Sequence, residues 1–314
     1  MDKESIIKKG MDVELAIESL AFGGMGVSRL NEKVTFVKNA IPGQIVVARI
    51  TKKRSSYLEA RLVNVITESP YSSPVKCEHF FDCGGCTFQN LDYEKQISAK
   101  EMQVNEIFSR IGGFKNINCS PIVKCKNIFH YRNKMEFTFS NQEYVPESEK
   151  DRSADKFALG LHAPGRWDKI LNINECHIQT KIANKILMEI KNLTKRLRPY
   201  NIREHTGFLR YVMIRSAENT GQVMINFVTS REDIDLLSPI SEHLTEQFPE
   251  VVSIVNNITD KKSGVSTGEH QVLLYGSEYI EEKIKDYKFI ISADSFFQTN
   301  SKQAEKLYEI ILEE

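Results

Sequence analysis

Three cysteines, Cys77, Cys83 and Cys86, lie within one short segment of the chain. The last two are separated by two glycines, which allow the tight turn through which neighbouring thiolates can bind one ion or cluster. Thiolate sites normally have four ligands, and Cys176 is the candidate for the fourth. Because thiolates are soft ligands, the pattern favours an iron–sulfur cluster or zinc.

Two other interpretations of these cysteines are open. Disulfides are disfavoured because six cysteines in 314 residues are few for a disulfide scaffold, and residues 1–10 lack the apolar run of a secretion signal. Structural zinc is the second alternative. Zinc ribbons usually pair two C-x2-C knuckles, and the chain has only the one at Cys83 and Cys86, so a cluster is favoured over zinc.

Composition indicates a globular protein with no global polyelectrolyte character. Lys and Arg number 42, as do Asp and Glu. Residues 1–66 are locally basic, with eleven Lys or Arg against seven Asp or Glu. No apolar stretch approaches the length of a membrane span. The sequence therefore predicts a cytoplasmic protein with no membrane partner.

The chain divides by its periodicity into an all-β segment and an α+β segment. Short alternating stretches over residues 10–66 predict strands that form a small barrel of the OB kind, although a sandwich is not excluded. Apolar positions over 93–111 predict a helix. The rest predicts strands and helices of an α+β domain with a largely antiparallel sheet: strands at 134–139, 156–162, 209–215, 222–228 and 251–257, and helices at 179–197 and 231–247.

Two connections and the last helix carry local signals. The segment 219–221 is a hairpin turn signal, and the acidic and polar stretch 141–156 predicts an exposed loop between two strands. Asn300 predicts the cap of a helix that still runs at Glu314. The apolar face of that helix has little left to pack against, so we expect that a further domain has been cut off.

Several segments together carry a family resemblance. They are 21–29, 41–46, 130–137, 207–215 and 295–300, with Cys77, Cys83, Cys86 and Cys176. With them the chain resembles the RNA (uracil-5-)-methyltransferases that have an N-terminal TRAM domain and a four-iron cluster. In that family a cysteine thiolate adds to carbon 6 of a uracil taken out of its stack, and carbon 5 then receives the methyl group.

The resemblance implies the fold class and the domain boundaries. It predicts a TRAM or OB-like β-barrel over 1–68, a central α+β domain with an antiparallel sheet and the cluster cysteines over 69–290, and the start of an S-adenosylmethionine-dependent methyltransferase domain over 291–314. The remainder of that Rossmann-like domain, with its catalytic cysteine and base, is expected but missing. The chain alone is therefore predicted to be inactive, and no catalytic residue is assigned.

The resemblance and the charge pattern together give candidate site residues. Cys77, Cys83, Cys86 and Cys176 would hold a 4Fe-4S cluster, and Gln298 would touch S-adenosylmethionine. Lys52, Lys53 and Arg54 precede Tyr57 on a barrel loop, an arrangement suited to single-stranded RNA. Arg132 and Lys134 alternate along a strand and could follow phosphates. The alternatives are a solvated turn for the first group and a polar outer sheet face for the second.

Three functions follow from these residues. The first is the RNA-recognition portion of an RNA (uracil-5-)-methyltransferase, a monomer that acts in RNA modification and rRNA processing, on 23S rRNA rather than tRNA. The alternative is a non-catalytic RNA-binding iron–sulfur adaptor. The third is an iron–sulfur redox carrier, which requires an exposed and reducible cluster.

Overall fold

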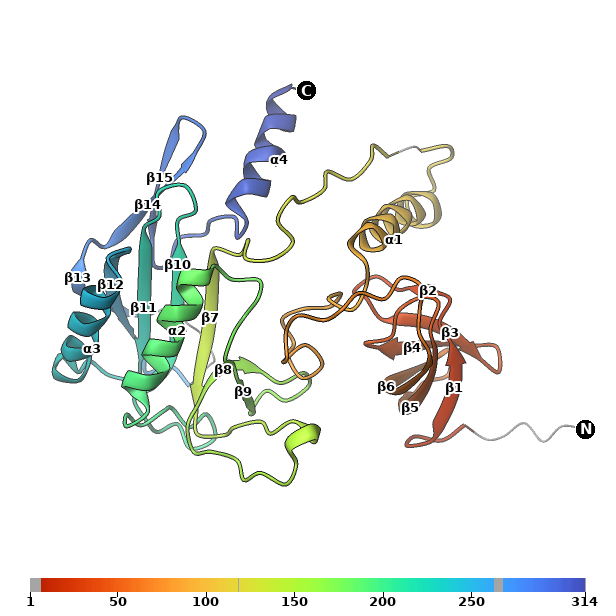
Figure 1. The fold of residues 1–314 in the computed structure, drawn as a ribbon, viewed down its shortest axis with the longest axis horizontal. Coiled ribbons are helices and arrows are strands. Elements are labelled where there is room, and N and C mark those ends of the chain that lie inside the picture. The colour runs from red at the N-terminus through yellow and green to blue at the C-terminus, as the bar shows by residue number, and fades with distance from the viewer. Residues whose placement is uncertain (1–6, 118, 263–267, 314) are drawn as a thin grey trace, which may run out of the picture. The chain divides into compact units, whose positions relative to one another are not determined.

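The computed structural model describes residues 7–117, 119–262 and 268–313. The ends of the predicted first and last domains, residues 1–6 and 314, lie outside the described residues. The chain forms two compact units (Figure 1). The first contains residues up to 81 and residues 85–124, and the second contains residues 82–84 and 125 onward.

A six-stranded sheet forms the core of the first unit. Its strands are β1 (Asp12–Ala16), β2 (Ser19–Leu20), β3 (Gly26–Leu30), β4 (Lys33–Lys38), β5 (Ile45–Lys53) and β6 (Tyr57–Thr67). They follow the order β1-β5-β6-β4-β3-β2. Alternating side chains of β1, β4, β5 and β6 meet in one apolar core that includes Leu15, Val37, Ile50 and Leu58. The alternation in the sequence therefore predicted the inward faces correctly.

The predicted helix over 93–111 is also present in this unit. Helix α1 (Tyr93–Glu106) continues into a π-helical turn, Ile107–Ile111. The carboxylate of Asp92 accepts hydrogen bonds from the backbone N–H groups of Glu94 and Lys95, which satisfies two donors that have no partner inside the helix.

A seven-stranded sheet organises the second unit. Its strands are β7 (Lys134–Ser140), β8 (Ala158–His162), β9 (Ile170–Asn172), β10 (Leu209–Ser216), β11 (Val223–Thr229), β12 (Val251–Ile258) and β13 (His270–Gly276), in the order β13-β12-β11-β10-β7-β8-β9. The described strand pairs of this sheet are antiparallel except β11 and β12, which are parallel, so the sheet is largely antiparallel, as the sequence predicted. The chain crosses between them through helix α3 (Ile234–Gln247), a connection that returns the second strand in the same direction.

Helices and a hairpin cover this sheet. Helix α2 (Lys181–Thr194) and α3 lie side by side against one face (Figure 1). The hairpin of β14 (Tyr279–Ile284) and β15 (Tyr287–Ser292) packs Ile280 and Ile291 against Met224 and Val255. Helix α4 (Ser301–Glu313) follows. Its predicted cap is confirmed, because the side-chain oxygen of Asn300 accepts a hydrogen bond of 3.0 Å from the backbone N–H of Gln303.

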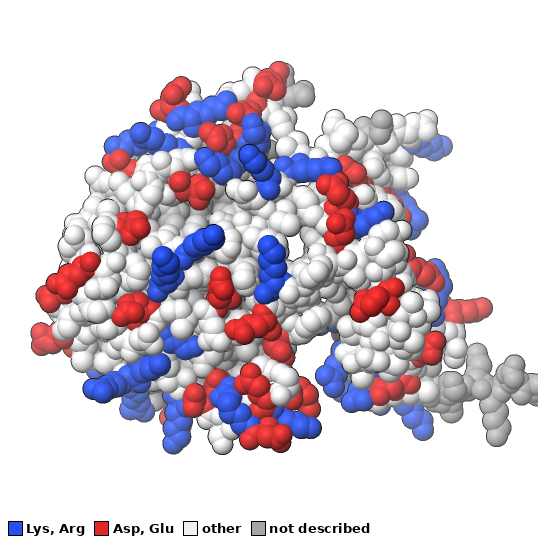
Figure 2. Space-filling model, viewed as in Figure 1, with Lys and Arg blue, Asp and Glu red and all other residues white. Residues whose placement is uncertain are grey.

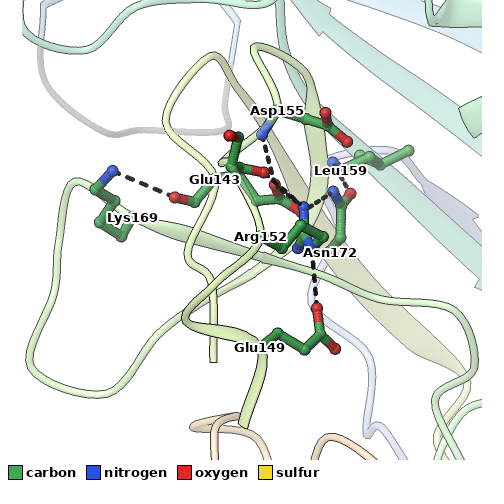
Figure 3. A network of polar contacts seen from close by, with 8 residues as sticks. Glu143, Glu149, Arg152, Asp155, Leu159, Lys169 and Asn172 are labelled. Atoms are coloured by element: carbon green, nitrogen blue, oxygen red, sulfur yellow. Dashed lines mark hydrogen bonds and ion pairs between the residues drawn. The ribbon is translucent and has the colours of Figure 1, made fainter. Parts of the chain in front are cut away.

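The loop between β7 and β8, which the sequence predicted as an exposed connection, is stabilised by hydrogen bonds to the buried carboxylate of Glu143. Glu143 is 3% exposed and accepts two hydrogen bonds from the guanidinium of Arg152, at 2.9 and 3.0 Å. It accepts two more from the backbone N–H of Asp155 and the amide of Asn172. Arg152 also bonds Glu149, on the short 3-10 turn Glu147–Glu149 (Figure 3). The loop is thus held by a network of charge-assisted hydrogen bonds around one carboxylate.

This carboxylate predicts a loss of stability in acid. Burial alone would raise the pKa of Glu143, but its hydrogen bonds with Arg152, Asp155 and Asn172 outweigh burial and hold the pKa below its usual 4.5. A pKa lower in the folded than in the unfolded chain stabilises the fold fully above pH 4.5, and that stabilisation is lost as the pH falls through the folded value. Urea unfolding measured from pH 7 to pH 3 should show a steeper loss for the wild type than for Glu143→Gln.

The control is Asp151→Asn, an exposed residue of the same loop, which should keep the wild-type pH dependence. Identical pH profiles for the wild type and Glu143→Gln would contradict the assignment.

Candidate nucleic-acid interface

Two cations face each other at the beginning of β7. Lys134 and Arg215 are register partners on the antiparallel strands β7 and β10. Arg215 is 4% exposed and donates a hydrogen bond of 2.7 Å to the carbonyl of Ser295. Burial lowers the pKa of Arg215 to about 10. Burial and the neighbouring Arg215 also lower the pKa of Lys134 below its usual 10.5.

Such a pair costs folding energy unless an anion compensates it. Like charges directly opposite on neighbouring strands destabilise a sheet, and burial adds to that cost. Asp294 attracts both cations and offsets part of the repulsion. Its carboxylate is held by the amide of Asn257 at 3.1 Å. The half-buried Lys134 remains accessible, so a phosphate that binds here would relieve the remaining repulsion.

Asn133 joins this pair to the segment that carries Gln298. Its backbone N–H donates to the carbonyl of Thr299, and its side-chain amide donates to the carbonyl of Gln298 and the hydroxyl of Ser301, at 2.9 to 3.0 Å. The side chain of Gln298 is exposed while its backbone is held. The structure therefore brings together two groups that were predicted separately, the cations of 132–134 and the residue expected to face S-adenosylmethionine.

Arg132 belongs to the same edge. It precedes β7, is half-buried, and its Nε donates to the carbonyl of Lys134 at 3.1 Å. Arg132 and Lys134 alternate with the buried Asn133 and Met135, as the sequence predicted. Both cations are thus positioned by backbone contacts at the partly exposed beginning of the strand.

The sequence did not predict a role for Arg215 or Asn226, which lie on the same face of the sheet as Lys134. Asn226 is 1% exposed, and among the described residues neither its amide nitrogen nor its amide oxygen has a hydrogen-bond partner. It is in register with Met213, which is in register with Glu136, so these residues share a sheet face with Lys134. Polar residues inside the apolar strands 209–216 and 223–229 were the available signal, since buried polar groups require an explanation.

Two of the three candidate RNA-binding cations of the first unit have their side chains engaged within the fold. Lys52 pairs with Glu59 at 2.8 Å, and Lys53 donates to the carbonyl of Ile7 at 3.0 Å. Arg54 lies exposed in the turn after β5, where its backbone N–H bonds the carbonyl of Tyr57. The Tyr57 ring packs edge-on against Phe36, with centroids 5.8 Å apart. RNA binding by Lys52, Lys53 and Arg54 stays a prediction.

The four candidate cluster cysteines are divided between the units. Cys77 and Cys86 belong to the first unit, and Cys83 and Cys176 to the second. The backbone of Cys176 is fixed by Asn184 of α2, whose side chain accepts from its N–H at 2.8 Å and donates to its carbonyl at 3.0 Å. Within the described parts of the chain, no group of three or more His, Cys, Asp or Glu side chains is placed to hold a metal ion.

The charged residues of the surface are mixed in sign. Figure 2 shows lysines and arginines lying among aspartates and glutamates on the face in view. This mixture agrees with the equal numbers of acidic and basic residues in the sequence. An RNA-binding site must therefore be sought in a local group of cations such as that at Lys134, and not in the net charge. Among the described helices, none combines the length and the apolar character needed to cross a membrane.

Comparisons with known proteins match this chain along most of its length. The TRAM domain model matches residues 8–63. An uncharacterized RNA methyltransferase of Chlorobaculum tepidum is 37% identical over 97% of the chain and 65% of its own length. Another from Porphyromonas gingivalis is 36% identical over 95% of the chain and 66% of its own length. The chain thus spans slightly less than two thirds of these relatives.

A solved structure extends the similarity to three dimensions. The tRNA (uracil-54, C5)-methyltransferase of Pyrococcus abyssi, solved in complex with S-adenosyl-L-homocysteine, is 27% identical to this chain. It superimposes with a TM-score of 0.70, over 96% of this chain and 64% of its own length.

These comparisons correct two predictions, the fold class with a missing Rossmann-like domain and the inactive fragment. Both depended on the open apolar face of the last helix and on the family resemblance. The similarity to RNA methyltransferases continues through 97% of the chain and the structural similarity through 96%. An exposed helix face at a chain end says nothing about what the protein contains or whether it is active. The classification as an inactive fragment is therefore wrong, and no absent domain is inferred. Residues 8–63 form a TRAM domain, and the chain is related along nearly its whole length to RNA methyltransferases.

Proposed function

We propose that this protein is an RNA (uracil-5-)-methyltransferase and that its second unit binds the RNA backbone at Lys134. The observation that carries the proposal is the Lys134–Arg215 pair: two cations directly opposite each other, one of them buried, beside the segment that presents Gln298. Two like charges directly opposite each other on neighbouring strands are costly to the fold. An RNA phosphate placed there would neutralise them.

The residues around Lys134 would bind and orient the RNA and the cofactor. Lys134 and Arg132 would contact phosphates, while Arg215, held by Ser295, would maintain a positive potential behind them. Asn133 fixes the backbone of Gln298, so this exposed side chain can meet a cofactor without reorganising its loop. S-adenosylmethionine would supply the methyl group when bound. The relative solved with S-adenosyl-L-homocysteine supports this choice of cofactor.

The substrate RNA is the finer part of the proposal. Resemblance of the sequence favours 23S rRNA, whereas the solved relative acts on tRNA. Mass-spectrometric mapping of 5-methyluridine in both RNAs from a strain lacking the gene decides between them, because the modification should disappear at one position in one RNA. If every 5-methyluridine persists, the methyltransferase proposal fails, and binding of RNA by the chain would then support the non-catalytic adaptor.

The iron–sulfur cluster stays a prediction from the sequence. Cys77, Cys83, Cys86 and Cys176 have the right chemistry, since four thiolates suit a 4Fe-4S cluster. An assay of iron and acid-labile sulfide in anaerobically purified protein tests it directly. The domain boundaries at 68 and 290, the monomeric state and the cytoplasmic location also remain proposals.

A further inference from the structure

A pocket lies on the second unit, away from Gln298, at the other end of β7. It is a shallow hollow that is open to solvent at its mouth. Its walls come from the ends of β7, β8 and β10, from the turn between β8 and β9, and from residues 200–202. Five of its lining residues carry aromatic rings: Phe139, His162, Trp167, Tyr200 and Tyr211. A shallow hollow lined by aromatic rings offers faces on which a planar group can stack.

Trp167 is displayed at the pocket by a tightly held turn. It is the only tryptophan of the chain, and it is 64% exposed. The turn is closed by backbone hydrogen bonds between Ala163 and Lys169 at 3.0 Å and between Arg166 and Ala163 at 2.9 Å. The next residue, Asp168, is buried and pairs with Arg203. A rigid backbone that exposes a large aromatic ring loses little entropy when a second ring stacks on it.

A buried cation lies behind the aromatic wall. Arg210 is 2% exposed and donates hydrogen bonds to the carbonyls of Thr259 and Lys261, at 2.9 and 2.7 Å. Its guanidinium carbon lies 4.4 Å from the centroid of the Tyr200 ring and 6.0 Å from that of Tyr211. This cation adds a positive charge to the pocket, and the acidic Asp168 that also lines it is paired with Arg203.

The pocket also contains polar residues that can form hydrogen bonds with a ligand. The hydroxyl of Thr138 lies 3.4 Å from the Nε2 atom of His162, and Ser140 also lines the pocket. Together they offer donors and acceptors beside aromatic faces. Proteins that recognise single-stranded RNA combine these two features, stacking the face of an extruded base and bonding its edge.

We propose that this pocket holds one unstacked base of the bound RNA. The proposal rests on the RNA-binding function proposed above and adds a second contact to it. Thr138 is in register with Tyr211, and Lys134 with Arg215, so the pocket and the cation pair occupy the same face of β7 and β10. Four residues of strand separate them, about 14 Å. An RNA strand with a phosphate at Lys134 could reach the pocket within a few nucleotides.

Because Trp167 is the sole tryptophan, its fluorescence reports on the pocket directly. Titration of the protein with a uridine octanucleotide should quench this fluorescence saturably. An abasic ribose-phosphate oligomer of equal length should bind through its phosphates without quenching. Trp167→Ala should weaken binding of the octanucleotide about tenfold, the order of loss found when one stacking residue is removed. Trp167→Phe, which keeps a ring, should restore most of the affinity.

Tyr287→Ala is the matched control, since Tyr287 is a 70% exposed aromatic residue on β15 of the same unit. It should bind the octanucleotide as the wild type does. The base-binding proposal would be overturned if the octanucleotide binds without changing the fluorescence and Trp167→Ala binds it as tightly as the wild type. RNA binding at Lys134 would be unaffected by that result. Absence of any RNA binding by the wild type would overturn both proposals.

Discussion

Replacement of Arg132 and Lys134 by alanine together is expected to lower the affinity of this chain for single-stranded RNA about 25-fold at about 0.1 M salt. Each phosphate contact of a single strand contributes about 0.7 to the slope of log affinity against log salt concentration, so two lost contacts lower the slope by about 1.4. The measurement is fluorescence anisotropy of a labelled RNA at several salt concentrations.

The slope is the sharper readout, because a variant that merely misfolds loses binding at all salt concentrations. Lys181→Ala with Lys185→Ala is the matched control, since it removes the same charge from exposed positions of α2. This control should retain nearly the wild-type slope. Equal losses in the two double variants would show that only net charge matters and would remove the support for a site at Lys134.

The pH dependence gives a second readout of the same site. Burial and Arg215 lower the pKa of Lys134, so it loses its charge at a lower pH than an ordinary lysine with a pKa of 10.5. RNA affinity should therefore decline on the alkaline side before ordinary lysines deprotonate, and Lys134→Arg should extend binding to higher pH.

Glu282→Ala is expected to lower the free energy of unfolding of the second unit by about 4 kcal/mol. Glu282 is fully buried on β14 and accepts hydrogen bonds from the backbone N–H groups of Glu218, Asn219 and Lys283, at 2.7 to 3.0 Å. The hydroxyl of Ser301 donates a fourth, at 2.8 Å. Truncation leaves these buried donors without an acceptor, which is costlier than the loss of an exposed ion pair.

Urea unfolding at neutral pH measures this change. Glu278→Ala, at an exposed carboxylate just before the same strand, should alter stability by less than about 0.5 kcal/mol. Glu282→Gln should give an intermediate loss, because it keeps one acceptor oxygen but brings an NH₂ group toward backbone donors. A Glu282→Ala variant as stable as Glu278→Ala would show that solvent or neighbouring groups replace the carboxylate.

The Glu282→Ala substitution should also destabilise residues 298–301, the segment that carries Gln298. Ser301 bonds both Glu282 and Asn133, and Asn133 holds the backbone of Gln298. Hydrogen exchange of the amides of 298–301 should therefore accelerate in Glu282→Ala more than in a variant of equal stability elsewhere. Through these contacts the buried Glu282 is a positioning residue for the exposed side chain of Gln298.

Local features of the fold were predicted well from the sequence. The hairpin at 219–221 joins β10 and β11, the helices at 93–111 and 179–197 are present, and Asn300 caps α4. Periodicity and caps involve residues a few positions apart, so the sequence displays them directly. Strands β9, β13, β14 and β15 were not predicted. Three-residue β9 is too short for a periodic signal, and β13 carries no clean alternation between buried and exposed positions.

The sequence by itself determined the candidate residues, through their types, their local spacing and a family resemblance: the cysteines, Arg132, Lys134 and Gln298. Only the tertiary structure decided their surroundings. It placed Arg215 opposite Lys134, Asn133 against Gln298 although 165 residues separate them, and Trp167 at an aromatic pocket. Strand order and register are set by packing of the whole sheet, and no local pattern states which distant residue a side chain will meet.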